Sequence, residues 1–161
     1  MGREVRMVPA TWQHPRDHRR RYMPLLGGSF AEEIAAWRKA RDLFAEGKDD
    51  TGRPLPESAK DCSFEDWHGS KPRERDYMPD WPAEARTHLQ MYETCSEGTP
   101  ISPVFATPED LARWLADTGA SAFADMTATY DQWLATIRRG SAVSAMFTPQ
   151  TGLISGVEAQ G

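Results

Sequence analysis

The sequence predicts an α+β fold, in which about four helices pack on a small, about three-stranded antiparallel sheet with a C-terminal hairpin. Apolar residues recur at helical spacing in several capped segments, which predicts amphipathic helices. Short alternating or apolar runs near both ends of the chain, the last two flanking a turn sequence, predict strands. The chain has 161 residues, of which 39% are hydrophobic, so it is long enough to bury one core. We therefore predict a single domain over residues 1–161.

The N-terminal part predicts one strand and one helix. Charged and apolar residues alternate over Glu4–Val8, as in a half-buried strand. Residues 10–28 contain prolines and end in two glycines, which indicates irregular structure. Ser29 and Glu32 form a capping box at the start of a helix that ends near Gly47. Its expected buried stripe consists of Phe30, Ile34, Trp37, Ala40 and Phe44.

The middle of the chain predicts a polar segment followed by a second helix. Residues 48–75 are rich in Gly, Pro, Ser and charges, and are expected to form a long loop or a short helix around Ser63–Trp67. Asp80-Trp81-Pro82 matches a helix start, with proline in the first turn. We expect this helix to bury Ala85, Leu89 and Tyr92 and to end at Gly98.

The C-terminal third predicts two further helices and a hairpin. Thr107 and Thr127 are the expected caps of the helices, which end before Gly119 and Gly140. The runs 142–147 and 153–157 flank the five-residue turn Thr148-Pro149-Gln150-Thr151-Gly152. Pairing this hairpin with the N-terminal strand would complete a three-stranded sheet.

Charge is distributed unevenly along the chain. The net charge is −5, yet the first 22 residues carry six arginines against Glu4 and Asp17. This predicts an acidic body with a basic N-terminal patch. No apolar run approaches the roughly 20 residues that span a bilayer, and the first residues lack the apolar stretch expected of a signal peptide. With only Cys62 and Cys95, two reduced thiols are expected, and the cytoplasm is the expected compartment.

No residue set has the spacing that catalysis or metal binding requires. His14 and His18 are four apart, but a proline between them disfavours the helix that would bring them together. Ser121 follows a helix, whereas a nucleophile elbow follows a strand. Asp80 and Glu84 fit a helix start better than a carboxylate metal site. Since no phosphate-binding glycine motif is present either, we expect no enzyme, cofactor or metal.

The sequence instead favours a recognition surface. Residues 77–81 place two aromatic side chains and a Met beside a rigid corner, and such side chains are enriched at interfaces. Arg16–Arg21, flanked by Trp12 and Tyr22, suits contact with phosphates and bases. The predicted partner-binding residues are Trp12, Arg16, Arg19, Arg20, Arg21, Tyr77, Asp80, Trp81, Arg86, His88, Glu93 and Glu97.

Two long segments, residues 77–105 and 114–137, resemble a family of uncharacterised small proteins encoded by phages and prophages. The opening GREVRMVPATWQHPRD and the later RYMPLLGG are similar to the start of that family. The resemblance covers roughly two-thirds of the chain and leaves residues 48–75 outside. It implies a viral accessory protein that acts in a bacterial cytoplasm.

By analogy with small phage proteins that lack catalytic motifs, we expect a non-catalytic protein that inhibits a host defence complex by steric occlusion, as anti-CRISPR proteins do. The expected partner is a host protein or nucleoprotein complex, with a minor nucleic-acid contact through Arg16–Arg21. One alternative is a binder of a small nucleotide signal, using residues 96–102 with Arg86 and His88. The other is a phage structural or assembly protein that self-associates through the hairpin edge.

Overall fold

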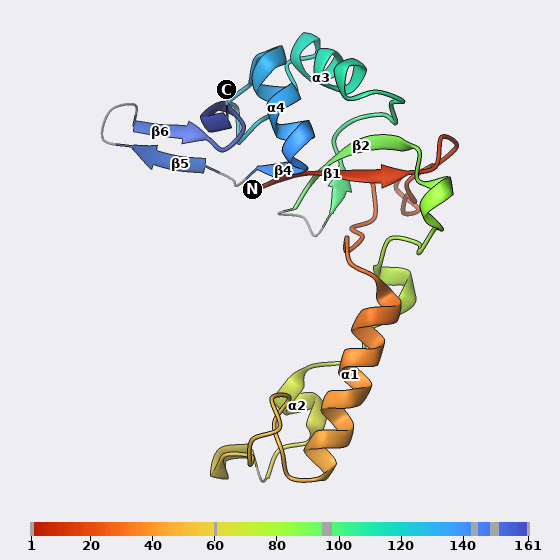
Figure 1. Cartoon of the computed structure of the whole chain (residues 1–161), viewed down its shortest axis with the longest axis vertical. Helices are drawn as coiled ribbons and strands as arrows, with labels where there is room; N and C mark the ends of the chain where they lie inside the picture. The colour runs from red at the N-terminus through yellow and green to blue at the C-terminus, as the bar shows by residue number, and fades with distance from the viewer. Residues whose placement is uncertain (1, 60, 95–97, 143–144, 149–151, 161) are drawn as a thin grey trace. The chain divides into compact units, whose positions relative to one another are not determined.

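The computed structural model describes residues 2–59, 61–94, 98–142, 145–148 and 152–160 (Figure 1). The chain divides into two compact units. One unit comprises Met1–Leu25 with Trp81–Gly161, and the other comprises Leu26–Asp80. The α+β class expected from the sequence is confirmed, whereas the single domain over residues 1–161 stays a prediction.

The first unit contains a four-stranded antiparallel sheet in the order β3-β2-β1-β4. Its two long strands, β1 (Arg3–Val8) and β2 (His88–Glu93), pair along their whole length. The edge strands β3 (Thr99–Pro100) and β4 (Ser141–Ala142) are short. The predicted strand at Glu4–Val8 is therefore confirmed and lies in the interior of the sheet.

One face of this sheet is covered by α3 (Pro108–Asp117) and α4 (Tyr130–Arg139), which Figure 1 shows on the same side of β1 and β2. Leu89 and Met91 alternate along β2 and point into the core that the two helices close. Burying these apolar side chains provides most of the driving force for folding of this unit. The buried core residues are Leu89, Met91, Leu111, Ala112, Leu115, Ala122, Trp133, Ile137, Ala142 and Val157.

Side-chain caps begin both helices. The Thr107 hydroxyl accepts a hydrogen bond from the backbone N–H of Asp110, as the sequence predicted. The fourth helix is capped by Thr129, which forms a capping box with Gln132, so the predicted cap at Thr127 was wrong by two residues. Both threonines precede the same apolar stripe, and only Thr129 stands three residues before a glutamine that can reciprocate.

The helix predicted to begin at Asp80-Trp81-Pro82 was wrong. Only a short 3-10 turn forms, at Ala83–Ala85, and β2 follows it. Four consecutive β2 residues, 89–92, are buried, because β2 lies between two strands and is covered on both faces. The helical spacing of its apolar residues was coincidental, since Leu89 and Met91 satisfy the two-residue period of a strand equally well.

The C-terminal hairpin is confirmed, but its place in the sheet differs from the prediction. Strands β5 (Ala145–Thr148) and β6 (Gly152–Ser155) pair with each other as a separate two-stranded sheet. Ala142, predicted to begin the hairpin, instead belongs to β4 and pairs with Arg3. Residues 143–144 of the first predicted arm and 149–151 of the turn lie outside the described residues.

The second unit contains α1 (Phe30–Ala45) and the short α2 (Phe64–His68). Ser29 caps α1, and the predicted stripe buries Ile34, Trp37 and Ala40. The helix α2 confirms the short helix that was one of the two alternatives for residues 48–75. Its Phe64 packs edge-on against Trp37 and contacts Phe44. Two 3-10 turns, at Glu57–Ala59 and Glu74–Asp76, complete this unit.

Within the part of the chain that the structure describes, no helix combines the length and the apolar character needed to cross a membrane. The thiol of Cys62 is free and exposed, and Cys95 lies outside the described residues.

Candidate functional site

The sheet face opposite α3 and α4 carries an unusual number of polar side chains. The register pairs Arg6 with Gln90 and Glu4 with Tyr92, and this alternation places the four on that face. The irregular segment 9–25 lies over them, because its side chains bond directly to β2. Arg6, Gln90 and Tyr92 are consequently buried, although two of the three are strongly polar.

The hydroxyl of Tyr92 is the centre of a hydrogen-bond network on this face. It accepts a hydrogen bond from the indole N–H of Trp12 at 3.1 Å and donates one to Oε1 of Gln90 at 2.8 Å. Gln90 in turn donates from Nε2 to the carbonyl of Ser102 at 2.8 Å. Nδ1 of His14 lies 3.2 Å from the same hydroxyl. The network thus ties the segment 9–25 to the sheet.

Protonation of this network follows from its burial. Burial raises the pKa of Tyr92 to about 12, so the hydroxyl keeps its proton. Burial also lowers the pKa of His14, and the charge of Arg6 adds to this effect, although a bond to the Met23 carbonyl opposes it. Since Nε2 of His14 lies 2.6 Å from that carbonyl, Nε2 carries the proton of the neutral ring. Nδ1 is then an acceptor, and Gln90 and His14 compete for the single Tyr92 proton.

Arg6 is a buried cation whose charge is compensated on three sides. Its Nε donates to Glu4 at 3.1 Å, and its Nη1 donates to the carbonyl of Leu25 at 2.7 Å. Its guanidinium carbon also lies 4.4 Å from the centroid of the Tyr92 ring. Gly98, which has a φ of +97°, lies against this group, and a Cβ there would clash with the Leu25 carbonyl oxygen. Arg6 therefore anchors the end of the segment 9–25.

An open cleft of about 610 Å³ lies over this network. Its floor includes His14 and Gln90, its walls include two aromatic rings, and Arg16 is the only formally charged residue among the described ones that line it. The nine lining residues are Trp12, Gln13, His14, Pro15, Arg16, Tyr22, Gln90, Pro103 and Val104. We call this cavity the sheet cleft.

A tight basic turn forms one side of the sheet cleft. Residues 16–22, which we call the basic loop, are closed by a bridge between Arg16 and Tyr22. The carboxylate of Asp17 accepts hydrogen bonds from the backbone N–H groups of Arg19 and Arg21 and from the Arg21 side chain. These bonds hold the pKa of Asp17 below its ordinary value. The loop is therefore fixed by its own contacts.

The basic loop contains four arginines, Arg16, Arg19, Arg20 and Arg21. All four are exposed. Arg16 donates from Nη1 to the carbonyl of Arg20 at 2.8 Å, and its guanidinium carbon lies 3.8 Å from the centroid of the Tyr22 ring. Arg20 has a φ of +62°, a left-handed conformation that the turn imposes on a non-glycine residue. The side chains of Arg19 and Arg20 form no ion pair with any described residue.

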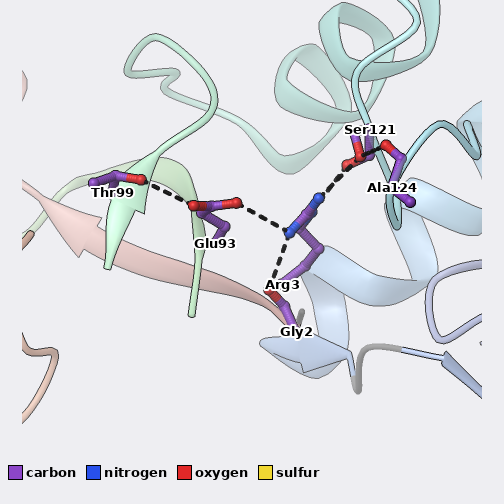
Figure 2. A network of polar contacts seen from close by, with 6 residues as sticks. All are labelled: Gly2, Arg3, Glu93, Thr99, Ser121 and Ala124. Atoms are coloured by element: carbon purple, nitrogen blue, oxygen red, sulfur yellow. Dashed lines mark hydrogen bonds and ion pairs between the residues drawn. The ribbon is translucent and has the colours of Figure 1, made fainter. Parts of the chain in front are cut away.

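A second buried arginine is structural. Arg3 is 2% exposed and donates to the carbonyl and the hydroxyl of Ser121 at 2.9 and 3.1 Å, as Figure 2 shows. It also lies 3.9 Å from the carboxylate of Glu93, which accepts a hydrogen bond from Thr99. Glu93 was predicted to bind a partner, but its carboxylate is held within the sheet by these contacts.

The structure brings together some of the predicted partner-binding residues. Trp12 lines the sheet cleft with Arg16, and Trp81 contacts Trp12 edge-on with ring centroids 4.7 Å apart. Arg19, Arg20 and Arg21 belong to the adjoining basic loop. The predicted aromatic corner is divided between the two units, because Tyr77 and Asp80 belong to the second one. There Asp80 accepts a hydrogen bond from the Ser29 hydroxyl rather than capping a helix.

The predicted nucleotide pocket does not coincide with the sheet cleft. Arg86 is exposed and His88 is half-buried beside the Thr87 hydroxyl, and neither lines the cleft. The hydroxyl of Ser102 is bonded to the backbone of Met91. Glu97 and residues 95–96 lie outside the described residues.

Sequence reasoning did not assign His14, Gln90 and Tyr92 to the site. The signal was present in the segment 88–93, where polar Gln90 and Tyr92 alternate with apolar Leu89 and Met91. Interpreting this segment as a strand would have placed Gln90 and Tyr92 on one face together. The helix interpretation hid that alternation.

The described residues contain no group of three or more His, Cys, Asp or Glu side chains that could hold a metal ion. In comparisons with known proteins, no protein-family model, no curated protein and no solved structure matches the chain.

Proposed function

We propose that the protein is a non-catalytic interaction protein that binds an acidic surface of a partner through the basic loop. The observation that carries this proposal is the exposure of four arginines at residues 16–21, on a loop fixed by its own hydrogen bonds, with a single carboxylate, that of Asp17, among them. Asp17 is already engaged by Arg21, so it does not neutralise Arg19 or Arg20. The loop thus offers unpaired cationic groups to an anionic partner.

Three physical features favour binding over a passive, solvated loop. The loop is ordered by its own hydrogen bonds, so less conformational entropy is lost on association. Tyr22 and Met23 expose 37% and 38% of their surface beside the arginines. Arg, Tyr and Met are side chains that interfaces favour. Positive charge on an otherwise acidic protein also steers the encounter with an acidic surface.

The resemblance of the sequence to small phage-encoded proteins supports a partner in a bacterial cytoplasm. On this basis we propose that the partner is a host defence complex, protein or nucleoprotein, and that binding inhibits it by steric occlusion, as anti-CRISPR proteins do. A nucleoprotein target would add a minor nucleic-acid contact through Arg16–Arg21.

Affinity purification of the tagged protein from a bacterial host tests this proposal. The variant Arg19→Ala/Arg20→Ala removes two charges from the basic loop, and Arg113→Ala/Arg139→Ala removes two exposed charges from α3 and α4 as a matched control. We expect the wild type and the control to retain a stoichiometric host complex whose activity is inhibited. The loop variant should retain less than about a fifth as much, because interface arginines are frequent hot spots. Equal retention by the loop variant would overturn the proposal.

The rival assembly function predicts self-association through the edges of the β5–β6 hairpin, which pairs with no other described strand. Light scattering of the purified protein separates the two functions. A concentration-independent monomer mass favours the interaction protein, and growth of the mass with concentration favours assembly.

A further inference from the structure

We propose that the sheet cleft binds a nucleotide, that is, a nucleobase together with its phosphate. The ligand is either a free mononucleotide or one unit of a single strand. This inference concerns the purified protein alone, and it stands or falls separately from the proposed macromolecular partner.

The walls of the cleft suit a planar ring. Trp12 and Tyr22 contribute aromatic surface, and both remain partly accessible to solvent. Pro103 and Val104 add apolar surface. Nucleobases stack on such side chains because every base has a π-face. The amide of Gln13 is exposed at the cleft and makes no hydrogen bond to a described residue, so it can meet the polar edge of a base.

The charge of the cleft suits a phosphate. Among the described residues that line the cleft, Arg16 is the only one with a formal charge, and none is a carboxylate. Because Arg16 uses Nη1 to reach the Arg20 carbonyl and stacks over Tyr22, its guanidinium is held in place. A guanidinium has five N–H donors, so others remain for an anion. Arg19 and Arg20, in the same loop, add positive charge without a competing ion pair among the described residues.

Two buried side chains, Gln90 and His14, form the floor of the cleft. Gln90 is held by Tyr92 and the Ser102 carbonyl, and His14 is held by the Met23 carbonyl, so both side chains keep fixed positions. The cavity of about 610 Å³ is within the range of roughly 300–1,000 Å³ that small-molecule sites occupy. Partly exposed aromatic side chains beside one fixed cation match a nucleotide better than an acidic peptide, which would use the cation alone.

Isothermal titration calorimetry at low salt tests the inference with four ligands: adenosine 5′-monophosphate, a short single-stranded oligonucleotide, inorganic phosphate and an oligoglutamate peptide. We expect the wild type to bind the nucleotide ligands saturably and much more tightly than inorganic phosphate. If the mononucleotide and the oligonucleotide bind equally per site, the ligand is a free nucleotide. Tighter binding of the oligonucleotide identifies a single strand.

Substitutions assign the binding to the cleft. Tyr22→Leu and Arg16→Gln should each weaken nucleotide binding at least about fivefold, since a stacked ring and a charge-assisted bond are lost. Tyr22→Phe, which keeps the ring, should retain it. The matched controls are Tyr130→Leu and Arg113→Gln, because Arg113 lies over the Tyr130 ring on α3 and α4 in the same way, at 5.2 Å.

Three outcomes would overturn the inference. The first is no saturable nucleotide binding by a wild type whose circular dichroism shows it to be folded. The second is binding of inorganic phosphate or oligoglutamate as tightly as the nucleotide, which would show an unspecific anion site. The third is equal weakening by the cleft variants and their controls.

Discussion

Among Tyr→Phe substitutions at the described tyrosines, Tyr92→Phe should lower the free energy of unfolding the most. The hydroxyl is buried and joins Trp12, Gln90 and His14, so its loss leaves Oε1 of Gln90 without a donor and Nε1 of Trp12 without an acceptor. Each unsatisfied buried group costs about 1–3 kcal/mol. Because Trp12 is only half-buried and the cleft admits water, we expect a total loss of about 2–3 kcal/mol in the free energy of unfolding.

Thermal and urea unfolding measure this loss. Tyr92 belongs to the unit formed by Met1–Leu25 and Trp81–Gly161, which has about 100 residues. For a unit of this size, a loss of 2–3 kcal/mol in the free energy of unfolding corresponds to a fall in Tm of roughly 10–20 °C. Tyr130→Phe is the matched control, because the Tyr130 hydroxyl has no hydrogen-bond partner among the described residues, and its removal should change stability by less than about 0.5 kcal/mol. If Tyr92→Phe and Tyr130→Phe lowered the free energy of unfolding equally, the network at Tyr92 would not hold the segment 9–25 to the sheet.

Three further substitutions probe the same unit. Gly98→Ala should destabilise it by about 2 kcal/mol more than Gly140→Ala in urea unfolding, since both glycines have positive φ but only Gly98 is crowded; equal losses would contradict the crowding. The pKa of His14 is lowered on folding, so below about pH 6.5 the unfolded state binds more protons than the folded state. The free energy of unfolding should therefore fall as the pH drops from about 6.5 towards the folded-state pKa of His14. His14→Gln should flatten that slope, and an unchanged slope would exclude His14 as its source. Arg3→Met should cost about 3 kcal/mol because Glu93 loses its buried cation, and a neutral result in the same assay would show that the pair contributes little.

The sequence was sufficient to predict a helix where a capping residue marks its start. Ser29 with Glu32 and Thr107 with Asp110 mark helix starts that a hydroxyl caps in the structure. The stripe after each cap then shows which side is buried. At the fourth helix the reciprocal partner Gln132, not the first available threonine, decides the cap.

The residues of β2 alone do not decide between a strand and a helix. Its apolar positions fit both a helix and a strand, and the choice is made by β1, which is some 80 residues away in the sequence and hydrogen-bonds along its whole length. The same long-range pairing positions Gln90 and Tyr92 under the segment 9–25. The polar network and the cleft above it therefore depend on tertiary structure, whereas the basic loop was visible as a cluster of arginines.

Hydrogen exchange on the captured complex tests the central claim most directly. The protein is bound to the host complex that it retains, and exchange of its peptides is compared with that of the free protein. We predict slower exchange in residues 12–22, which include the basic loop and one wall of the sheet cleft, with no change in α4. Slower exchange confined to peptides outside residues 12–22 would contradict the claim that this surface binds the partner.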